Sequence, residues 1–246
     1  YLAEQTHPIR REVALKTLRN TVATDPQVRS RFVIEQQSLA RLNHPNIAQV
    51  FDAGTSSQGR PYFCMEFVDG SPITTYCDSR RMPLRERIAL FLDVCRGVEY
   101  AHGRGIVHRD LKPDNVVLIP DEEVAGKERV KILDFGLARF LDSPERRTTA
   151  GVALGTPTYM SPEQCMGDEL DGKSDVYTLG VILYELIADQ VPFPGEEMGR
   201  VMRQHVDQQP RQVRELNPQI SVEVAGLVRP GILIEIEVTA AVPASR

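Results

Sequence analysis

Residues 108–115 read His108-Arg109-Asp110-Leu111-Lys112-Pro113-Asp114-Asn115, and Asp134-Phe135-Gly136 follows them after two strand-like runs. Magnesium prefers oxygen ligands, so Asn115 and Asp134 are candidate ligands of a magnesium ion that also binds phosphates. Asp110 can orient an attacking hydroxyl and accept its proton, and Lys112 can lie against a phosphoryl group in transfer. These are the side chains that phosphoryl transfer from a metal-bound nucleotide requires.

Three further motifs accompany this pair in a fixed order. They are Val13-Ala14-Leu15-Lys16, Ser161-Pro162-Glu163 and a helix-like segment at residues 173–180. With these motifs the chain resembles the Hanks-type, or eukaryotic-like, serine/threonine protein kinases. The resemblance extends from residue 1 to about residue 199. The residues within the motifs favour bacterial members of the family. A tripeptide alone recurs by chance, but an eight-residue motif with its companions in order is specific. The resemblance implies an α+β fold of two lobes, a small β-rich lobe with one regulatory helix and a larger, mainly helical lobe.

The resemblance also implies how ATP is held. Lys16 would hold the α- and β-phosphates, paired with Glu35, which shares a helix face with Leu39 four residues on. Residues 66–68 would be the hinge whose backbone binds adenine, with Met65 just before it. The residues implied around the nucleotide are Ala14, Lys16, Glu35, Glu66, Val68, Val117 and Asp134.

The catalytic residues implied by the resemblance are Asp110, Lys112, Asn115 and Thr156. Asn115 and Asp134 would hold Mg²⁺, and Thr156 would bridge Asp110 and Lys112. The Lys112 position and residues 155–160 resemble serine/threonine kinases rather than tyrosine kinases. Asp175 would brace the catalytic loop by accepting backbone hydrogens, and His108 is expected to be a packed core residue rather than a catalyst.

A polar loop at residues 137–160 suggests regulation by phosphorylation. Arg109 precedes the candidate base, and Arg109 and Arg139 could together neutralise a phosphothreonine. Thr148 and Thr149 are the expected acceptors. The alternative is that these threonines are ordinary solvated loop residues.

The hydrophobic pattern gives the domain organisation. Residues 84–102 and 173–188 have the apolar pattern of helices, and a helix is expected to start at Asp25. Runs at 12–16, 47–51, 61–68, 115–119 and 130–133 are strand-like. The break at residues 69–72 divides a small lobe (1–68) from a large lobe (69–226), and residues 227–246 form an atypical tail.

Three features depart from the family pattern. The family's glycine-rich loop would lie before Tyr1, so we expect the chain as given to bind nucleotide less well. Residues 232–238 alternate like a strand where the family has helices. The resemblance places Glu163 at a buried position, and no arginine suited to pair with it is evident. An unpaired buried carboxylate would cost about 3–5 kcal/mol.

Composition restricts the partners. The net charge of -5 offers no basic field for nucleic acid, and the four cysteines have no metal-site spacing. No run of residues is apolar and long enough for a membrane span. We therefore expect a cytoplasmic domain, free or part of a membrane-anchored protein, whose partners are ATP and proteins with serine or threonine. The alternatives are a non-catalytic kinase-like scaffold module and, less favoured, a small-molecule phosphotransferase.

Overall fold

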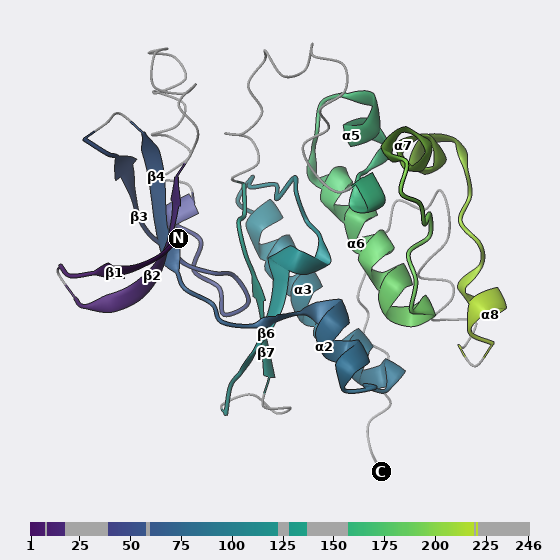
Figure 1. The fold of residues 1–246 in the computed structure, drawn as a ribbon, viewed down its shortest axis with the longest axis horizontal. Helices are drawn as coiled ribbons and strands as arrows, with labels where there is room; N and C mark the ends of the chain where they lie inside the picture. The colour runs from purple at the N-terminus through teal and green to yellow at the C-terminus, as the bar shows by residue number, and fades with distance from the viewer. Residues whose placement is uncertain are drawn as a thin grey trace.

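The computed structural model of the 246-residue chain describes residues 1–7, 9–17, 39–57, 60–122, 128–136, 157–218 and 220. A four-stranded sheet lies on one side and a mainly helical region on the other, with a small second sheet between them (Figure 1). This agrees with the two-lobed α+β architecture expected from the sequence. Within the described part of the chain, no helix has the length and apolar character needed to cross a membrane.

The first sheet consists of β1 (Leu2–Gln5), β2 (Arg11–Thr17), β3 (Val50–Thr55) and β4 (Pro61–Glu66). All neighbours are antiparallel, in the order β1-β2-β4-β3. Val13, Phe63 and Met65 are buried, which supplies the apolar side of the sheet. The expected strand at residues 47–51 begins later, at Val50, because Ile47 bridges instead to Ile132 of the second sheet.

The second region combines a short antiparallel sheet with helices. Its strands, in spatial order, are β5 (Ser71–Pro72), β6 (Val116–Pro120) and β7 (Glu128–Ile132). Its α-helices are α2 (Ile73–Ser79), α3 (Leu84–His102), α5 (Pro162–Met166), α6 (Gly172–Ala188), α7 (Met198–Asp207) and α8 (Val213–Leu216). Two single 3-10 turns, η2 (Pro113–Asn115) and η4 (Pro157–Tyr159), complete it.

Helix α6 is the centre of the large lobe. It packs against α3, and its residues from Leu179 to Ile187 are almost all buried, as its uniformly apolar sequence predicts. Asp171 caps its N-terminus by accepting a hydrogen bond from the backbone N–H of Lys173. The apolar run predicts the helix at residues 173–188, and the cap at Asp171 fixes where it starts.

The segment before β3 attaches the two lobes to each other. The N–H of Ala48 donates to Ile132 O, and the N–H of Ile132 donates to Asn46 O. The Asn46 side chain donates to the carbonyl of Val130 at 3.0 Å. Gly97 of α3 permits this contact, because a Cβ there would lie 2.7 Å from the Ile132 side chain. Residues 46–48, although they precede β3, are therefore bonded to β7.

Arg87 ties three helices of the large lobe together. From α3 it donates to the carbonyls of Met82 and Leu186, and it forms ion pairs with Asp78 and Asp189 at 2.9 and 2.8 Å. The residue is buried. A buried arginine with four acceptors fixes where α2, α3 and the end of α6 meet.

Replacing Arg87 by leucine should lower the free energy of unfolding by about 2–3 kcal/mol, because the carbonyls of Leu186, which is buried, and Met82, which is half-buried, lose their donor. Urea unfolding followed by circular dichroism measures this. Arg96→Leu is the matched control, since Arg96 pairs with Asp93 on the exposed side of the same helix and should cost at most about 1 kcal/mol. Equal losses for both variants would contradict the special role of Arg87.

Candidate active site

Lys16 and Asp134 meet between the two sheets, although 118 residues separate them in the chain. The Lys16 Nζ lies 2.7 Å from Asp134 Oδ2. Strand β2 carries Lys16. Asp134 lies two residues after the end of β7, and its backbone has a positive φ of 61°. Both side chains are about one-third exposed, so the pair opens to solvent rather than being sealed in a core. Lys16, the candidate phosphate-binding residue, and Asp134, the candidate metal ligand, therefore lie at one site.

The loop before β6 brings three of the catalytic candidates together, Asp110, Lys112 and Asn115. Asn115 Nδ2 donates to the Asp110 carbonyl at 2.7 Å and lies 3.4 Å from Asp110 Oδ2. Lys112 Nζ is 3.5 Å from the same carboxylate oxygen. The N–H of Leu133 donates to Asn115 O at 2.8 Å, which joins this loop to the residue before Asp134. The loop and the Asp134 segment thus form one hydrogen-bonded unit.

Asp175 holds this loop from below, as expected from the sequence. One carboxylate oxygen, Oδ2, accepts from the N–H of His108 at 2.7 Å, and Oδ1 accepts from the N–H of Arg109 at 2.9 Å. His102 Nε2 of α3 also lies 2.7 Å from Oδ2. Arg109 has a φ of 70°, a conformation that costs a non-glycine residue about 1–3 kcal/mol and needs such support.

We expect Asp175→Asn to lower the free energy of unfolding by about 2–3 kcal/mol, since an amide offers one acceptor where two backbone donors converge. Thermal and urea unfolding measure the change. Asp168→Asn serves as the control, because Asp168 is exposed just before the same helix and should change stability by less than about 0.5 kcal/mol. A fully stable Asp175→Asn protein would refute the bracing role.

His108 is a packed residue, in agreement with the sequence-based expectation. It is fully buried, its Nε2 lies 2.8 Å from Leu133 O, and its ring packs against Phe135 at 4.7 Å between centroids. Its Nδ1 accepts from the N–H of Asp110 at 3.3 Å. The imidazole therefore supports the backbone on both sides of the site.

The residues implied around adenine lie where the two sheets approach. Ala14 of β2 is paired in register with Met65 of β4, which is buried. Val117 of β6 is buried and opposite Pro72. Glu66 is the last residue of β4, and Val68 lies in the irregular segment that leads from it to β5. Their contact with a nucleotide stays a prediction.

Several site predictions lie outside the residues that the structure describes. These are Glu35, Arg139, Thr148, Thr149 and Thr156, together with the tail at 227–246. The helix expected from Asp25 was predicted to stop at His44. Of it, residues 39–43 are described, and only 39 and 40 are helical, so its described part ends earlier than predicted.

The expectation for Glu163 was wrong in one respect. The residue is half-buried rather than buried, and its carboxylate accepts a hydrogen bond from the Ser174 hydroxyl. It lies in the first turn of α5, where a negative charge is favourable. These contacts remove the large penalty that a buried, unpartnered carboxylate would carry.

Sequence reasoning missed a contact that fixes the segment Pro157–Tyr159. The Tyr159 hydroxyl donates to Glu185 of α6 at 2.8 Å, and Thr178 donates to the Tyr159 carbonyl at 2.9 Å. Burial raises the pKa of the Tyr159 hydroxyl, and it also raises the pKa of the Glu185 carboxyl, which the hydrogen bond from Tyr159 partly offsets. The only sequence signal was Glu185 itself, the one charged residue in the apolar run at residues 179–188.

Asn115 and Asp134 fit a magnesium ion that phosphates help to hold. Because the amide nitrogen of Asn115 bonds to Asp110, its oxygen Oδ1 is the end that can bind a metal. Within the described residues, no cluster of three or more His, Cys, Asp or Glu side chains could hold a metal alone. Magnesium commonly binds through one or two protein oxygens plus phosphates and water, which is the donor set present here.

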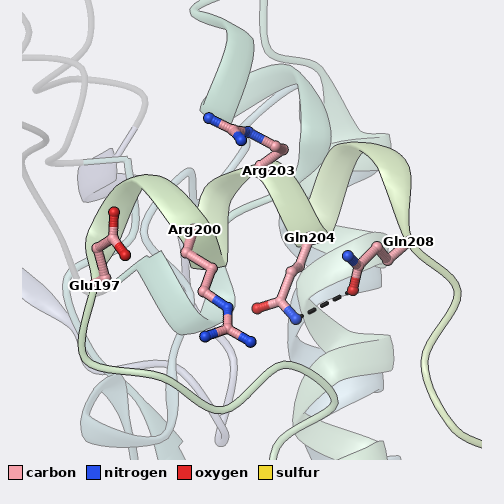
Figure 2. Close-up of a pocket in the computed structure, with 5 residues that line it drawn as sticks. All are labelled: Glu197, Arg200, Arg203, Gln204 and Gln208. Atoms are coloured by element: carbon pink, nitrogen blue, oxygen red, sulfur yellow. Dashed lines mark hydrogen bonds between the residues drawn. The ribbon is translucent and has the colours of Figure 1, made fainter.

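A shallow pocket of about 330 Å³ lies along α7, on a helix that carries none of these residues. Figure 2 shows Arg200 and Arg203 directed to different sides of the helix, while Gln204 bonds to Gln208. The two guanidinium groups do not converge on one point. We therefore assign the pocket no role in the chemistry.

Comparison with known proteins agrees with this geometry. The family model described as protein kinase domain matches residues 4–230. A probable serine/threonine-protein kinase of Streptomyces coelicolor is 40% identical over 223 residues, which are 89% of this chain and 32% of that protein. The serine/threonine-protein kinase PknB of Mycobacterium leprae is 38% identical over 224 residues, 89% of this chain and 35% of that protein.

A solved structure shows the same arrangement in space. The PknI kinase domain of Mycobacterium tuberculosis superposes with a TM-score of 0.65 at 28% identity, covering 92% of this chain and 80% of that one. The chain spans about a third of the length of the curated relatives it matches. With the family match over nearly its whole length, the chain belongs to the protein kinase domain family.

Proposed function

We propose that this chain is the catalytic domain of a serine/threonine protein kinase, which transfers the γ-phosphoryl group of ATP to hydroxyls of proteins. One observation carries the proposal: hydrogen bonds and ion pairs hold together five side chains from three separate segments, namely Lys16, Asp134, Asn115, Asp110 and Lys112. Both related sequences compared above are named serine/threonine-protein kinases.

Each of these side chains has a distinct task. Asp110 would orient the acceptor hydroxyl and take its proton, because its carboxylate is partly exposed and kept in place by Asn115. Lys112 lies beside the Asp110 carboxylate, and its positive charge would offset the negative charge of the phosphoryl group during transfer. Lys16 would exchange Asp134 for the α- and β-phosphates when ATP enters. Magnesium on Asn115 and Asp134 would neutralise the phosphates.

Hydroxyl choice and regulation are part of the same proposal. Lys112 and residues 155–160 favour serine and threonine over tyrosine, and Thr156 would bridge Asp110 and Lys112. We further propose that Thr148 or Thr149, once phosphorylated, binds Arg109 and Arg139. The domain would act in the cytoplasm, where ATP is available and where the free cysteines Cys64, Cys77 and Cys95 stay reduced.

Incubation of the full-length protein with γ-labelled ATP, Mg²⁺ and a generic basic protein tests this function. We expect label on phosphoserine and phosphothreonine after acid hydrolysis, and no label once EDTA removes the metal. Nucleotide binding with no label transfer would point to a kinase-like scaffold instead. Label found on phosphotyrosine alone would contradict the substrate class.

A further inference from the structure

Two ion pairs among the described residues join the first sheet to the second. One is Lys16 with Asp134, which belongs to the phosphate site described above. The other joins Glu66 and Lys131 and has no part in the proposed chemistry of phosphoryl transfer. Lys131 was not singled out by its sequence, because a lysine in a strand ordinarily extends to solvent.

The geometry of the second pair is closely defined. Both carboxylate oxygens of Glu66 approach Lys131 Nζ, at 2.8 and 2.9 Å. The oxygen Oε2 also accepts from the N–H of Gln49 at 3.1 Å, while the N–H of Glu66 donates to the Gln49 carbonyl at 2.8 Å. The Lys131 side chain is only 12% exposed and that of Glu66 26%. A pair this shielded from water interacts more strongly than an ordinary surface pair.

The position of Glu66 gives this pair its significance. Glu66 ends β4, and the backbone then runs irregularly through residues 67–70 before β5 begins at Ser71. The first residue of the proposed adenine-binding hinge is therefore held through its side chain as well as through its backbone. The orientation of Glu66 therefore depends on Lys131 of β7, which binds the Glu66 carboxylate.

The same strand leads directly to the phosphate end of the site. Lys131 lies three residues before Asp134, and its neighbours Val130 and Ile132 are fully buried, so β7 has little freedom to shift. One short stretch thus anchors the hinge at one end and presents the candidate metal ligand at the other. This stretch therefore links the proposed adenine-binding hinge to the candidate metal ligand.

We propose that Lys131 is a positioning residue for nucleotide binding, which acts through Glu66 to fix the backbone of the hinge. This inference rests on the proposed function, since the hinge is that of the same nucleotide site. Without the pair, the sheets remain joined by residues 46–48, but the hinge peptide loses the side-chain anchor nearest to adenine.

The test is a set of variants in the full-length protein, with KM for ATP and kcat measured separately. Lys131→Met removes the charge at similar length, Glu66→Gln keeps the acceptor for Gln49, and Lys131→Arg keeps the positive charge. We expect each neutral variant to raise the KM for ATP roughly five- to tenfold with little change in kcat. The double variant should be no worse than either single one, and Lys131→Arg should restore most of the affinity.

Arg129→Met is the matched control. Arg129 lies on the same strand and forms an ion pair of similar exposure with Asp121, but within the large lobe. It should leave the KM for ATP unchanged even where it lowers the melting temperature. A fluorescent ATP derivative gives dissociation constants for all five proteins and the wild type.

The outcomes separate the inference from the function. The positioning role alone would be overturned if the wild-type protein binds and uses ATP but the neutral variants keep its KM. The same conclusion would follow if those variants lose kcat and ATP affinity equally. Additive effects in the double variant would also overturn it. Wild-type protein that binds no ATP derivative would overturn the proposed function, and the inference with it.

Discussion

Replacing Asp134 by asparagine is expected to lower the rate of phosphoryl transfer roughly a thousandfold, even at saturating ATP. The carboxylate is the one negatively charged candidate ligand for magnesium in the site, and Asn115 alone supplies only a neutral oxygen. Without that charge, the metal is held weakly and the phosphates of ATP are poorly neutralised. Initial rates over a range of Mg²⁺ concentrations measure the effect.

Asp93→Asn is the control for this prediction. Asp93 forms an ion pair with Arg96 on α3, a helix that carries none of the candidate metal ligands, so its removal should leave the rate and its magnesium dependence unchanged. Full activity of the Asp134→Asn protein at ordinary Mg²⁺ concentration would show that this carboxylate does not hold the metal.

Asp110→Asn should lower kcat by about a hundred- to ten-thousandfold and leave the affinity for ATP as it is. An amide has the same shape as the carboxylate, so the hydrogen bond between Asn115 and the Asp110 carbonyl is kept. It cannot accept a proton from the acceptor hydroxyl. The loss should therefore be in the chemical step, which single-turnover measurements and ATP titrations distinguish.

Asp114→Asn provides the comparison within the same loop. Asp114 is exposed, and it should keep the wild-type kcat. If Asp110→Asn lowered the melting temperature and ATP affinity as much as kcat, the residue would be structural rather than catalytic.

The helices of the large lobe could be predicted because their sequences carry local information. The apolar stripe of α3 predicted Leu84–His102, which are its observed bounds. The apolar run predicted a helix at residues 173–188, which is within one residue of the observed start of α6. By contrast, α2 has only seven residues and neither a capping side chain nor an acidic residue in its first turn. It forms because Ile73 and Cys77 are buried in the core, which the sequence alone does not show.

Strand limits and ion pairs depended on contacts between distant segments. Ile47 and Ala48 have a strand-like pattern but pair with Ile132 of the second sheet, so β3 starts later than predicted. The motifs singled out Lys16, Asp110, Asn115 and Asp134, and the structure links these residues through hydrogen bonds and an ion pair, while their roles stay a prediction. Lys131 was missed, because a charged residue reveals its partner only once the chain has folded.

Locating the metal directly tests the convergence of these side chains on one nucleotide. Crystals of the full-length protein with a non-hydrolysable ATP analogue and Mn²⁺ would show the ion by its anomalous scattering. We expect a manganese ion bound by oxygens of both Asn115 and Asp134 at roughly 2.0–2.3 Å, with Lys16 moved from Asp134 to the phosphates. A manganese ion elsewhere, or Asp110 directed away from the γ-phosphate, would contradict the assignment of this site.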